Sequence, residues 1–526
     1  MKTRRLIQPF VLALFLFASF ANAQTSAPKP EDANASSPKA KQSLVDLQTK
    51  IAMVLANPSL RRGQVGVKIL TSSDGAVVYE RNAENYFMPA SNMKSFTVAA
   101  AIERLGPDFK FRTSVYTMTP PDESGTVKGD LIVYGRGDPS FSGSFNEENQ
   151  YARFDELADA LVAAGVKNVE GSIVGDDSYF RTEPIPSGWE WDDLQWYYGA
   201  EVSALTAFDN TIGMKVASGI VGKPALVLLD PYSLVVRIVN KTTTVGAGEK
   251  DSLRITKLLG QNVYEISGNV AVGGRGFDGR IAVSKPALYF ADVLARRLRL
   301  KGVTIKNGVR SIGSSERGSE VFPNEIYSEI AGVDSPPLSL IAQKTMKPSQ
   351  NLYTELILRA LGEKTGSTNE PEASSEKKGI DEVNALLSRA GVEPRSIIQY
   401  DGSGLSRHNL ITPDAAARLF QYMDRSRNAA VWRNALTIGG VDGTLRNRFK
   451  NTIAQNNVRG KTGTIDQVSA LSGYVTSRSG VRFVFSVLTN AIPDSRLRTD
   501  TIDKIVLALA EYDGELSPNQ VTSGAK

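Results

Sequence analysis

Two residue types that carry much of enzyme chemistry are scarce in this sequence. The 526 residues include no cysteine and one histidine, His408. Without cysteine, thiol catalysis, disulfide bonds and thiolate metal sites are excluded. One histidine is too few for the usual structural zinc sites and multi-histidine catalytic sites, so we expect neither a metal nor a cofactor.

A Ser-His-Asp hydrolase is not favoured either. Such an enzyme would need His408, which lies in a turn-like segment at residues 405–409. The Gly-x-Ser-x-Gly elbow of many serine hydrolases is missing, and Gly402-Ser403-Gly404 is not one. We therefore interpret His408 as a surface or loop-packing residue.

Long runs of one charge sign are missing as well. The formal net charge is +5, and Lys2, Arg4 and Arg5 supply three of these positive charges, so the rest of the chain carries +2. No cluster of lysine and arginine marks a nucleic-acid surface. We therefore expect no nucleic-acid partner.

The three basic residues begin a targeting segment. Residues 6–20 are almost wholly apolar, and Ala21-Asn22-Ala23 is a small-x-small cleavage site. This pattern indicates a secretory signal peptide over residues 1–23, because the apolar run is shorter than the roughly 20 residues of a membrane helix. We expect a mature protein without an integral membrane span, secreted through the inner membrane to the periplasm and loosely associated with the wall. An uncleaved signal anchor and an outer-surface location are the alternatives.

The composition then divides the chain. Residues 24–43 are rich in proline, alanine and serine and are predicted to be a disordered tether, and residues 516–526 a flexible tail. Residues 44–109 and 287–515 mix helical and strand patterns, whereas residues 110–286 contain short Val, Ile and Tyr runs between Gly, Asp and Pro turns. The predicted fold class is therefore an α/β (α+β) core interrupted by a large, mainly β insertion.

Periodicity and turn residues also place individual elements in the core. Near the amino end of the core, the sequence predicts a strand hairpin around Ser72-Ser73-Asp74-Gly75. Near the carboxyl end, it predicts a second pair of strands. Helices are predicted over 91–105, 288–300, 338–361, 413–425 and 499–512, strands over 470–476 and 481–489, and a polar loop over 366–378.

A first candidate for catalysis is Ser91 with Lys94. The pair lies at the start of a predicted helix after Pro89, three residues apart and so on one helix face. An amine one turn from a serine can take its hydroxyl proton, provided that burial lowers the amine's pKa. The spacing alone is common, and other matches lie in polar segments where we expect no helix to orient them. These matches begin at Ser36, Ser374 and Ser375.

A second candidate is Ser349-Gln350-Asn351. Its hydroxyl can relay a proton, and its amide can hold a substrate carbonyl. The plainer interpretation is an N-cap on a helix that runs from Asn351 to Leu361, and the two interpretations are compatible.

A third candidate is Lys461-Thr462-Gly463-Thr464. Lysine and threonine can bind a carboxylate, and glycine lets the backbone approach a ligand closely. The segment leads into a predicted strand pair, whereas a similar triplet, Lys364-Thr365-Gly366, follows a helix and fits a helix C-cap. We therefore favour Lys461 over Lys364.

In this order, the three motifs are the signature of the serine β-lactamase and penicillin-binding superfamily. Ser91 and Ser349 lie 258 residues apart, which is too long for a plain β-lactamase. The chain resembles the class C low-molecular-mass penicillin-binding proteins, the D-alanyl-D-alanine carboxypeptidase/endopeptidase family, which carries a large insertion there. One difference is at position 350, where this chain has Gln and the family usually has Asp. Further similar segments, over residues 45–512, are Gly135–Pro139, Asp176–Phe180, Trp189–Asp193, Asp401–Ser406 and Gly440–Leu445.

This resemblance implies a role for each motif residue. Ser91 would form an acyl-enzyme with the peptide between two D-amino acids, and Lys94 would act as its general base. Ser349 and Lys461 would pass a proton to the departing amine, while Asn351 would hold the substrate peptide. Thr462, Gly463 and Thr464 would bind the substrate, with the two threonines on its terminal carboxylate and the N–H groups of Ser91 and Thr464 as the oxyanion hole.

The implied function is a serine D-Ala-D-Ala carboxypeptidase or endopeptidase that acts on peptidoglycan stem peptides and is acylated by β-lactam antibiotics as covalent inhibitors. The alternatives are a β-lactamase and a non-catalytic cell-wall-binding protein. The balance of carboxypeptidase, endopeptidase and transpeptidase activity stays open, as does the role of the insertion. Its tryptophans Trp189, Trp191 and Trp196 fit domain packing better than a glycan platform.

Overall fold

The computed structural model describes residues 41–317, 322, 325–366 and 372–516. The predicted signal peptide, nearly all of the predicted tether and the tail after residue 516 lie outside the described residues. No helix in these described ranges is both long and apolar enough to cross a membrane.

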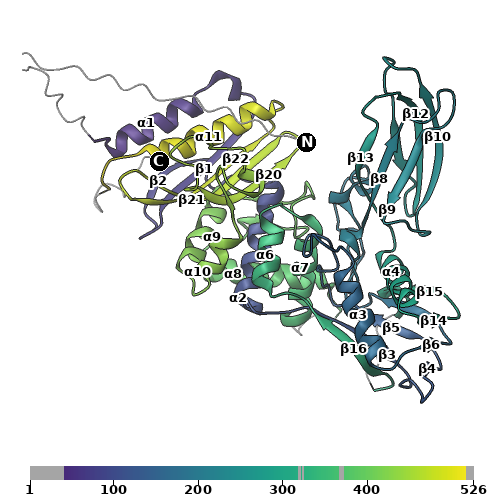
Figure 1. The fold of residues 1–526 in the computed structure, drawn as a ribbon. Helices are drawn as coiled ribbons and strands as arrows, with labels where there is room; N and C mark the ends of the chain where they lie inside the picture. Colours follow the sequence, from purple (N-terminus) through teal and green to yellow (C-terminus); the bar gives the residue numbers. More distant parts are fainter. Residues whose placement is uncertain (1–40, 318–321, 323–324, 367–371, 517–526) are drawn as a thin grey trace, which may run out of the picture. The chain divides into compact units, whose positions relative to one another are not determined.

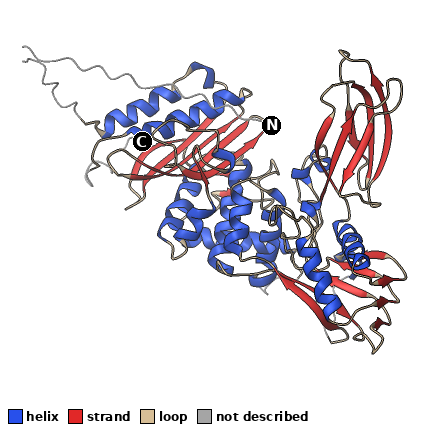
Figure 2. Cartoon of the chain, viewed as in Figure 1, coloured by secondary structure: helices blue, strands red, loops and turns tan. Residues whose placement is uncertain are grey.

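One antiparallel sheet of six strands organises the core (Figures 1 and 2). Its strand order is β19-β20-β21-β22-β1-β2, so the first strands of the chain pair with the last. The strands are β1 (Gln64–Thr71), β2 (Val77–Arg81), β19 (Thr437–Ile438), β20 (Arg459–Ile465), β21 (Val468–Thr476) and β22 (Arg482–Asn490). The predicted hairpin and the predicted strand pair near the carboxyl end are both present.

Two helices from opposite ends of the chain pack together and cover this sheet: α1 (Leu44–Leu55) and α11 (Ser495–Glu511). Both begin at side-chain caps that satisfy free backbone N–H groups. Ser43 and Asp46 form a capping box on α1, and Asp494 accepts from two backbone N–H groups of α11. Their buried leucines and isoleucines share a cluster with one face of the sheet.

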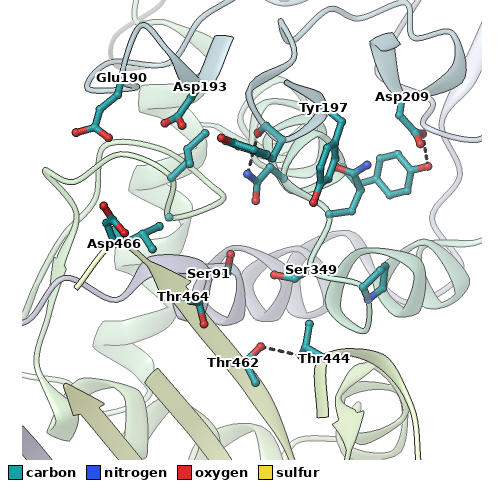
Figure 3. A pocket seen from close by; sticks show the side chains of 18 of the residues that line it. Ser91, Glu190, Asp193, Tyr197, Asp209, Ser349, Thr444, Thr462, Thr464 and Asp466 are labelled. Atoms are coloured by element: carbon teal, nitrogen blue, oxygen red, sulfur yellow. Dashed lines mark hydrogen bonds between the residues drawn. The ribbon is translucent and has the colours of Figure 1, made fainter. Parts of the chain in front are cut away.

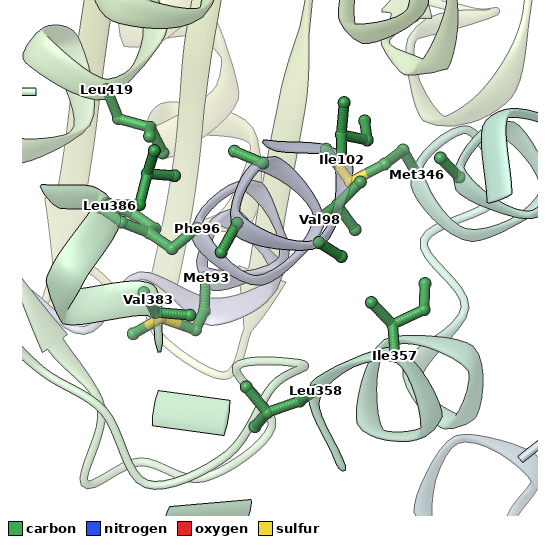
Figure 4. Packing of buried hydrophobic residues seen from close by; sticks show 14 of the residues in the cluster. Met93, Phe96, Val98, Ile102, Met346, Ile357, Leu358, Val383, Leu386 and Leu419 are labelled. Carbon is green, nitrogen blue, oxygen red and sulfur yellow. The ribbon is translucent and has the colours of Figure 1, made fainter. Parts of the chain in front are cut away.

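A helical layer lies against the other side of the sheet, and α2 (Lys94–Leu105) runs through it (Figure 4). Phe96, Val98 and Ile102 of this helix and Met93 just before it are fully buried. Because α2 is surrounded by apolar side chains, its position is fixed, and with it the position of Ser91 just before it. The surrounding helices are α6 (Leu338–Met346), α7 (Asn351–Thr365), α8 (Ser375–Arg389), α9 (Pro413–Arg425) and α10 (Ala429–Ala435), and a two-stranded ribbon, β17 (Ile397–Ile398) with β18 (Leu410–Ile411), completes the core.

Two helix predictions and one loop prediction need correction. The helix predicted from Ser91 begins with a 3₁₀ turn, η2 (Ala90–Met93), before α2 starts. The stretch predicted as one helix over 338–361 is two helices, because residues 347–350 leave the helix and Ser349 has a left-handed φ of 67°. The loop predicted over 366–378 ends early, because α8 begins at Ser375 with Ser374 as its cap.

The insertion contains four small sheets. A five-stranded sheet has the order β15-β7-β5-β3-β16, and three-stranded sheets have the orders β14-β6-β4, β13-β8-β9 and β10-β12-β11. The strands are β3 (Arg112–Thr117), β4 (Thr126–Val127), β5 (Leu131–Tyr134), β6 (Asn168–Val169), β7 (Ile173–Asp176), β8 (Thr211–Ala217), β9 (Leu226–Asp230), β10 (Arg237–Val245), β11 (Arg254–Lys257), β12 (Val263–Ala271), β13 (Phe277–Ala282), β14 (Thr304–Ile305), β15 (Val309–Ile312) and β16 (Ser328–Asp334).

The strand pairing favours an end of the insertion later than the predicted residue 286. Strands β14, β15 and β16 pair with β6, β7 and β3 of the insertion, and helix α4 (Pro286–Leu300) shares its hydrophobic cluster. Helix α3 (Ala152–Ala163), which was not predicted, packs in the same cluster, and a short helix, α5 (Ser314–Arg317), follows β15. We propose that the insertion spans residues 112–334.

Candidate active site

The three predicted motifs meet at one cavity of about 890 Å³ (Figure 3). Ser91, Ser349, Asn351, Thr462 and Thr464 line it, from η2, the start of α7 and strand β20. The core and the insertion both contribute to its wall. The insertion residues are Ser144, Glu190, Asp192, Asp193, Tyr197, Tyr198 and Asp209.

Ser91 and Lys94 are in hydrogen-bond contact. Lys94 Nζ lies 3.0 Å from Ser91 Oγ, across the turn between η2 and α2. The Lys94 side chain is wholly buried, and Ser91 opens to the cavity. Burial lowers the pKa of Lys94 to about 7, against a weaker raising effect of Asp401 and Glu355. A neutral amine is therefore accessible near physiological pH.

The other neighbours of Lys94 fit a neutral amine. Asn351 Oδ1 accepts from Nζ at 2.6 Å, and the Ser403 carbonyl accepts at 2.7 Å. A neutral amine has two N–H groups and one lone pair. Since two oxygen acceptors occupy both N–H groups, the lone pair is left for the hydroxyl proton of Ser91. The arrangement therefore allows Lys94 to accept the hydroxyl proton of Ser91.

Ser349 and Lys461 form a second serine–lysine pair. Lys461 Nζ lies 2.8 Å from Ser349 Oγ and 2.8 Å from the Thr462 carbonyl. Burial, followed by the nearby Lys94, lowers the pKa of Lys461 well below its usual value. The N-cap of α7 is the Gln350 side chain, which accepts from the Leu352 N–H. The Ser349 hydroxyl is thus free of the capping role and contacts Lys461 instead.

Strand β20 lies directly against the turn that carries Ser91. A Cβ added at Gly463 would lie 2.3 Å from the Pro89 carbonyl, so only glycine permits this approach. Asn92 reinforces it by donating to the Lys461 carbonyl at 2.7 Å. The Thr462 hydroxyl lies in the cavity, 2.7 Å from the hydroxyl of Thr444.

The sequence analysis missed Glu355, which lies behind Lys94. Glu355 is wholly buried on α7, one turn after Asn351, and its two oxygens accept from the backbone N–H groups of Gly402 and Ser403 at 3.0 and 2.7 Å. Since the Ser403 carbonyl holds Lys94, α7 positions both acceptors of that amine. The i, i+4 spacing of Asn351 and Glu355 was the available signal.

Residues 401–404 form the loop that brings the Ser403 carbonyl to Lys94. Asp401, wholly buried, accepts from the Gly404 and Ser406 N–H groups, both at 2.7 Å, and from the Trp189 indole at 2.9 Å. A Cβ at Gly404, where φ is 82°, would lie 1.9 Å from the Ala90 carbonyl. The loop can therefore pack against η2 only with glycine at this position.

The insertion also contacts the catalytic motifs directly. The Tyr198 carbonyl accepts from Asn351 Nδ2 at 2.8 Å, so the amide that orients Lys94 is itself oriented by the insertion. Trp189, which is buried, joins the insertion to Asp401. Nothing in the local sequence around Tyr198 predicts this contact, because it depends on long-range packing.

His408 has no place among these groups. Its ring packs against Tyr400 with centroids 5.1 Å apart, and it does not line the cavity. Across the described part of the chain, no three histidine, cysteine or acidic residues are grouped as metal ligands.

Comparison with known proteins places this site in a family. Residues 47–512 match the D-Ala-D-Ala carboxypeptidase 3 (S13) family. A D-alanyl-D-alanine carboxypeptidase from an Actinomadura species is 31% identical over 488 residues, which cover 90% of this chain and 86% of that protein. The carboxypeptidase DacB of Haemophilus influenzae is 24% identical over 440 residues, which cover 83% of this chain and 87% of that protein.

Solved structures show the same fold. Penicillin binding protein 4 (dacB) from Haemophilus influenzae superposes with a TM-score of 0.74 at 24% identity, and covers 90% of this chain and 100% of that one. The same protein in complex with a β-lactam gives a TM-score of 0.67 at 22% identity, with 88% and 97% covered. The α/β core with additional β sheets is therefore the fold of that protein.

Proposed function

Because the chain belongs to the D-Ala-D-Ala carboxypeptidase 3 (S13) family and is a serine D-Ala-D-Ala carboxypeptidase, we propose that Ser91 is the nucleophile of its acyl-enzyme. The observation that carries this proposal is the environment of Lys94. Its amine is buried, has oxygen acceptors for two N–H groups, and lies 3.0 Å from Ser91 Oγ.

Acylation begins with transfer of the Ser91 hydroxyl proton to the lone pair of Lys94. The oxygen then attacks the carbonyl carbon between the two D-alanine residues, and the carbonyl oxygen becomes an oxyanion. The backbone N–H groups of Ser91 and Thr464 stabilise that charge, and such donors contribute about 3–4 kcal/mol each in related chemistry.

Collapse of this intermediate breaks the C–N bond and requires a proton on the departing nitrogen. Ser349 donates it, and Lys461, 2.8 Å away, replaces the proton on Ser349. Since the proton donor must lie beside the group that it protonates, the leaving group occupies the Ser349 side of Ser91. Thr462 and Thr464 bind the leaving residue's carboxylate, and Asn351 holds the peptide of the acyl portion.

Water then attacks the ester and gives its proton to Lys461 through Ser349, Lys94 returns its proton to the Ser91 oxygen, and the shortened peptide is released. A β-lactam follows the same first step, but its ring C–N bond opens without releasing a fragment, so the acyl-enzyme persists. The natural partners are therefore peptidoglycan stem peptides, and β-lactam antibiotics are covalent inhibitors. The sequence pattern of residues 1–23 supports secretion to the periplasm.

Intact-protein mass spectrometry after incubation with benzylpenicillin tests the proposal. Wild-type protein should gain the mass of one drug molecule, and Ser91→Ala should gain none. Folded wild type that leaves the drug intact and gains no mass would contradict the proposal and support a non-catalytic binding protein. Rapid hydrolysis of the drug without a lasting adduct would indicate a β-lactamase.

A further inference from the structure

The far end of the cavity, on the Ser349 side, contains a carboxylate from the insertion that the mechanism does not use. Figure 3 shows Asp209 beyond Ser349, at the opposite end of the cavity from Glu190 and Asp466. The Tyr353 hydroxyl donates to Asp209 Oδ1 at 2.6 Å, and Ser144 contacts the same hydroxyl at 2.6 Å. Tyr353 lies on α7, two residues after Asn351.

The backbone that carries Asp209 is strained. Phe208, Asp209 and Asn210 have φ values of 50°, 62° and 54°, which is the left-handed region that residues other than glycine rarely adopt. Such a backbone conformation is destabilising and persists only where the surrounding contacts impose it. Backbone strain of this kind is enriched at ligand-binding sites, so this turn is a candidate for a functional role.

Contacts with the rest of the insertion impose the left-handed conformation of residues 208–210. The Phe208 ring is buried in the insertion's hydrophobic cluster, and its carbonyl accepts from Arg280 at 3.0 Å and from the Thr211 hydroxyl at 2.8 Å. Asn210 is wholly buried, and its side chain accepts from the Ala207 N–H at 3.1 Å. These contacts anchor both neighbours of Asp209 in the insertion and leave Asp209 to face the cavity.

Asp209 has unused capacity to accept hydrogen bonds. Burial and then Asp209 raise the pKa of Tyr353 well above its usual value, so the phenol stays protonated and donates to Oδ1. Among the residues that the structure describes, Tyr353 is the one hydrogen-bond partner of the Asp209 side chain, which lines the cavity and has no donor at Oδ2. A ligand at this end of the cavity would therefore be held through its own N–H groups.

A single D-alanine leaving group has no such donor. Its nitrogen is the scissile one beside Ser349, its carboxylate is bound by the threonines, and its methyl group is apolar. A leaving residue that is itself part of a second stem peptide extends further from Ser349 and carries amide N–H groups. The chemistry of this end of the cavity thus matches a peptide leaving group.

We propose that Asp209, oriented by Tyr353, forms a leaving-group subsite that binds amide N–H groups of a second stem peptide, so that the enzyme cleaves peptide cross-links. This inference rests on the proposed function, because the position of the leaving group follows from the role of Ser349. It also gives the insertion a role in substrate choice. Asp209 is a specificity-determining residue and takes no part in the bond-breaking step.

Two substrates with the same acyl portion test the subsite. One is a stem pentapeptide that releases D-alanine, and the other is a cross-linked dimer that releases a second stem peptide. Asp209→Asn keeps a residue that tolerates the left-handed turn and removes the charge. The ratio of kcat/KM for the dimer to kcat/KM for the pentapeptide should fall about tenfold, as expected for loss of a charge-assisted hydrogen bond.

Three controls make the result specific. Asp209→Gly keeps the turn without any side chain and should lower the ratio at least as much. Tyr353→Phe removes the donor to Asp209 and should lower it less. Asp466→Asn makes the same chemical change at the opposite end of the cavity, where it should leave the ratio as in wild type.

The possible failures are distinguishable. Wild type that is acylated by benzylpenicillin at Ser91 but cleaves only the pentapeptide would overturn the subsite and leave the proposed function intact. An unchanged ratio in Asp209→Asn, or an equal fall in Asp466→Asn, would overturn the subsite as well. Wild type that is not acylated and cleaves neither substrate would overturn the proposed function itself.

Discussion

The Ser-x-x-Lys spacing occurs at the start of two helices of this protein, and the pairs Ser91–Lys94 and Ser374–Lys377 have opposite surroundings. At α2, Ser91 faces the cavity and Lys94 is wholly buried among oxygen acceptors that carry no charge. At α8, Ser374 caps the helix by accepting from the Lys377 backbone N–H at 3.1 Å. The Lys377 amine lies 2.7 and 2.6 Å from the two oxygens of Asp381.

The environment, and not the spacing, therefore distinguishes the two serine–lysine pairs. The Lys377 side chain is 52% exposed and pairs with the carboxylate of Asp381. The Lys94 side chain is buried instead, and burial lowers the pKa of its amine to about 7. The expectation that the second pair lies outside a helix was wrong, yet the expectation that it has no catalytic surroundings agrees with these contacts.

The strongest test of this comparison replaces each lysine in turn. Lys94→Met should lower the rate of acylation by benzylpenicillin about 10³-fold, since a general base contributes about 10²–10⁴-fold. Lys377→Met should leave this rate within about twofold of wild type, because surface changes far from a site perturb little. Stopped-flow fluorescence or timed mass spectrometry would measure both rates. Similar losses in the two variants would refute the assignment of Lys94 as the base.

A smaller effect on the acylation rate is expected from a change at Glu355, which lies behind Lys94. Glu355→Gln leaves one oxygen acceptor and places an NH₂ group opposite a backbone N–H of residues 402–403. The Ser403 carbonyl should then hold Lys94 less well, and acylation should slow about tenfold. Glu382→Gln, at a carboxylate that pairs with Arg104 at the far end of α2, is the matched control.

The pH dependence separates this effect from simple destabilisation. Wild-type acylation should rise with pH up to about 7 and level off above, because the neutral form of Lys94, whose pKa is about 7, is the reactive one. Burial raises the pKa of Glu355 to about 8, and where this carboxyl is ionised its charge favours protonated Lys94, so its removal should move the upper part of the rise to lower pH. A slower variant with an unshifted profile would leave Glu355 a purely structural residue.

The smallest effect concerns the stability contributed by the α8 pair. Lys377→Met removes an exposed i, i+4 contact with Asp381, and such pairs contribute about 0.3–0.5 kcal/mol. The free energy of unfolding, measured by urea denaturation, should therefore fall by less than about 1 kcal/mol. A larger loss would mean that Lys377 has a structural role beyond this surface pair.

Local patterns in the sequence were sufficient for elements with clear signals. Helix α9 has the predicted bounds, because Thr412 caps it and Pro413 occupies its first turn. The strands β21 and β22 were also predicted within about two residues. Helix α3 was missed although Phe154, Leu157, Ala158 and Leu161 have helical spacing, because the surrounding β-rich composition outweighed this pattern.

The residues of the candidate site also divide into those that local sequence patterns predicted and those that they did not. The three motifs were identified because their residues are close in sequence, and their family resemblance brought Ser91, Ser349 and Lys461 together. The contacts of Glu355 with the 402–403 peptide and of Tyr198 with Asn351 join residues 47 and 153 positions apart. Such contacts depend on how whole helices and loops pack together, and a single sequence does not reveal this packing.

The order of strands in the core sheet has a consequence for when the enzyme becomes active. Strand β1 pairs with β22 along its whole length, from Gln64 with Asn490 to Thr71 with Phe483. During synthesis, β1 must therefore wait for almost all of the chain before its partner exists, and such non-local closure is slow. The turn carrying Ser91 packs against β20, which belongs to the same late sheet. Hydrolytic activity should thus appear only at the last stage of folding, so a partly folded chain would pose no hazard to the wall that the mature enzyme cuts.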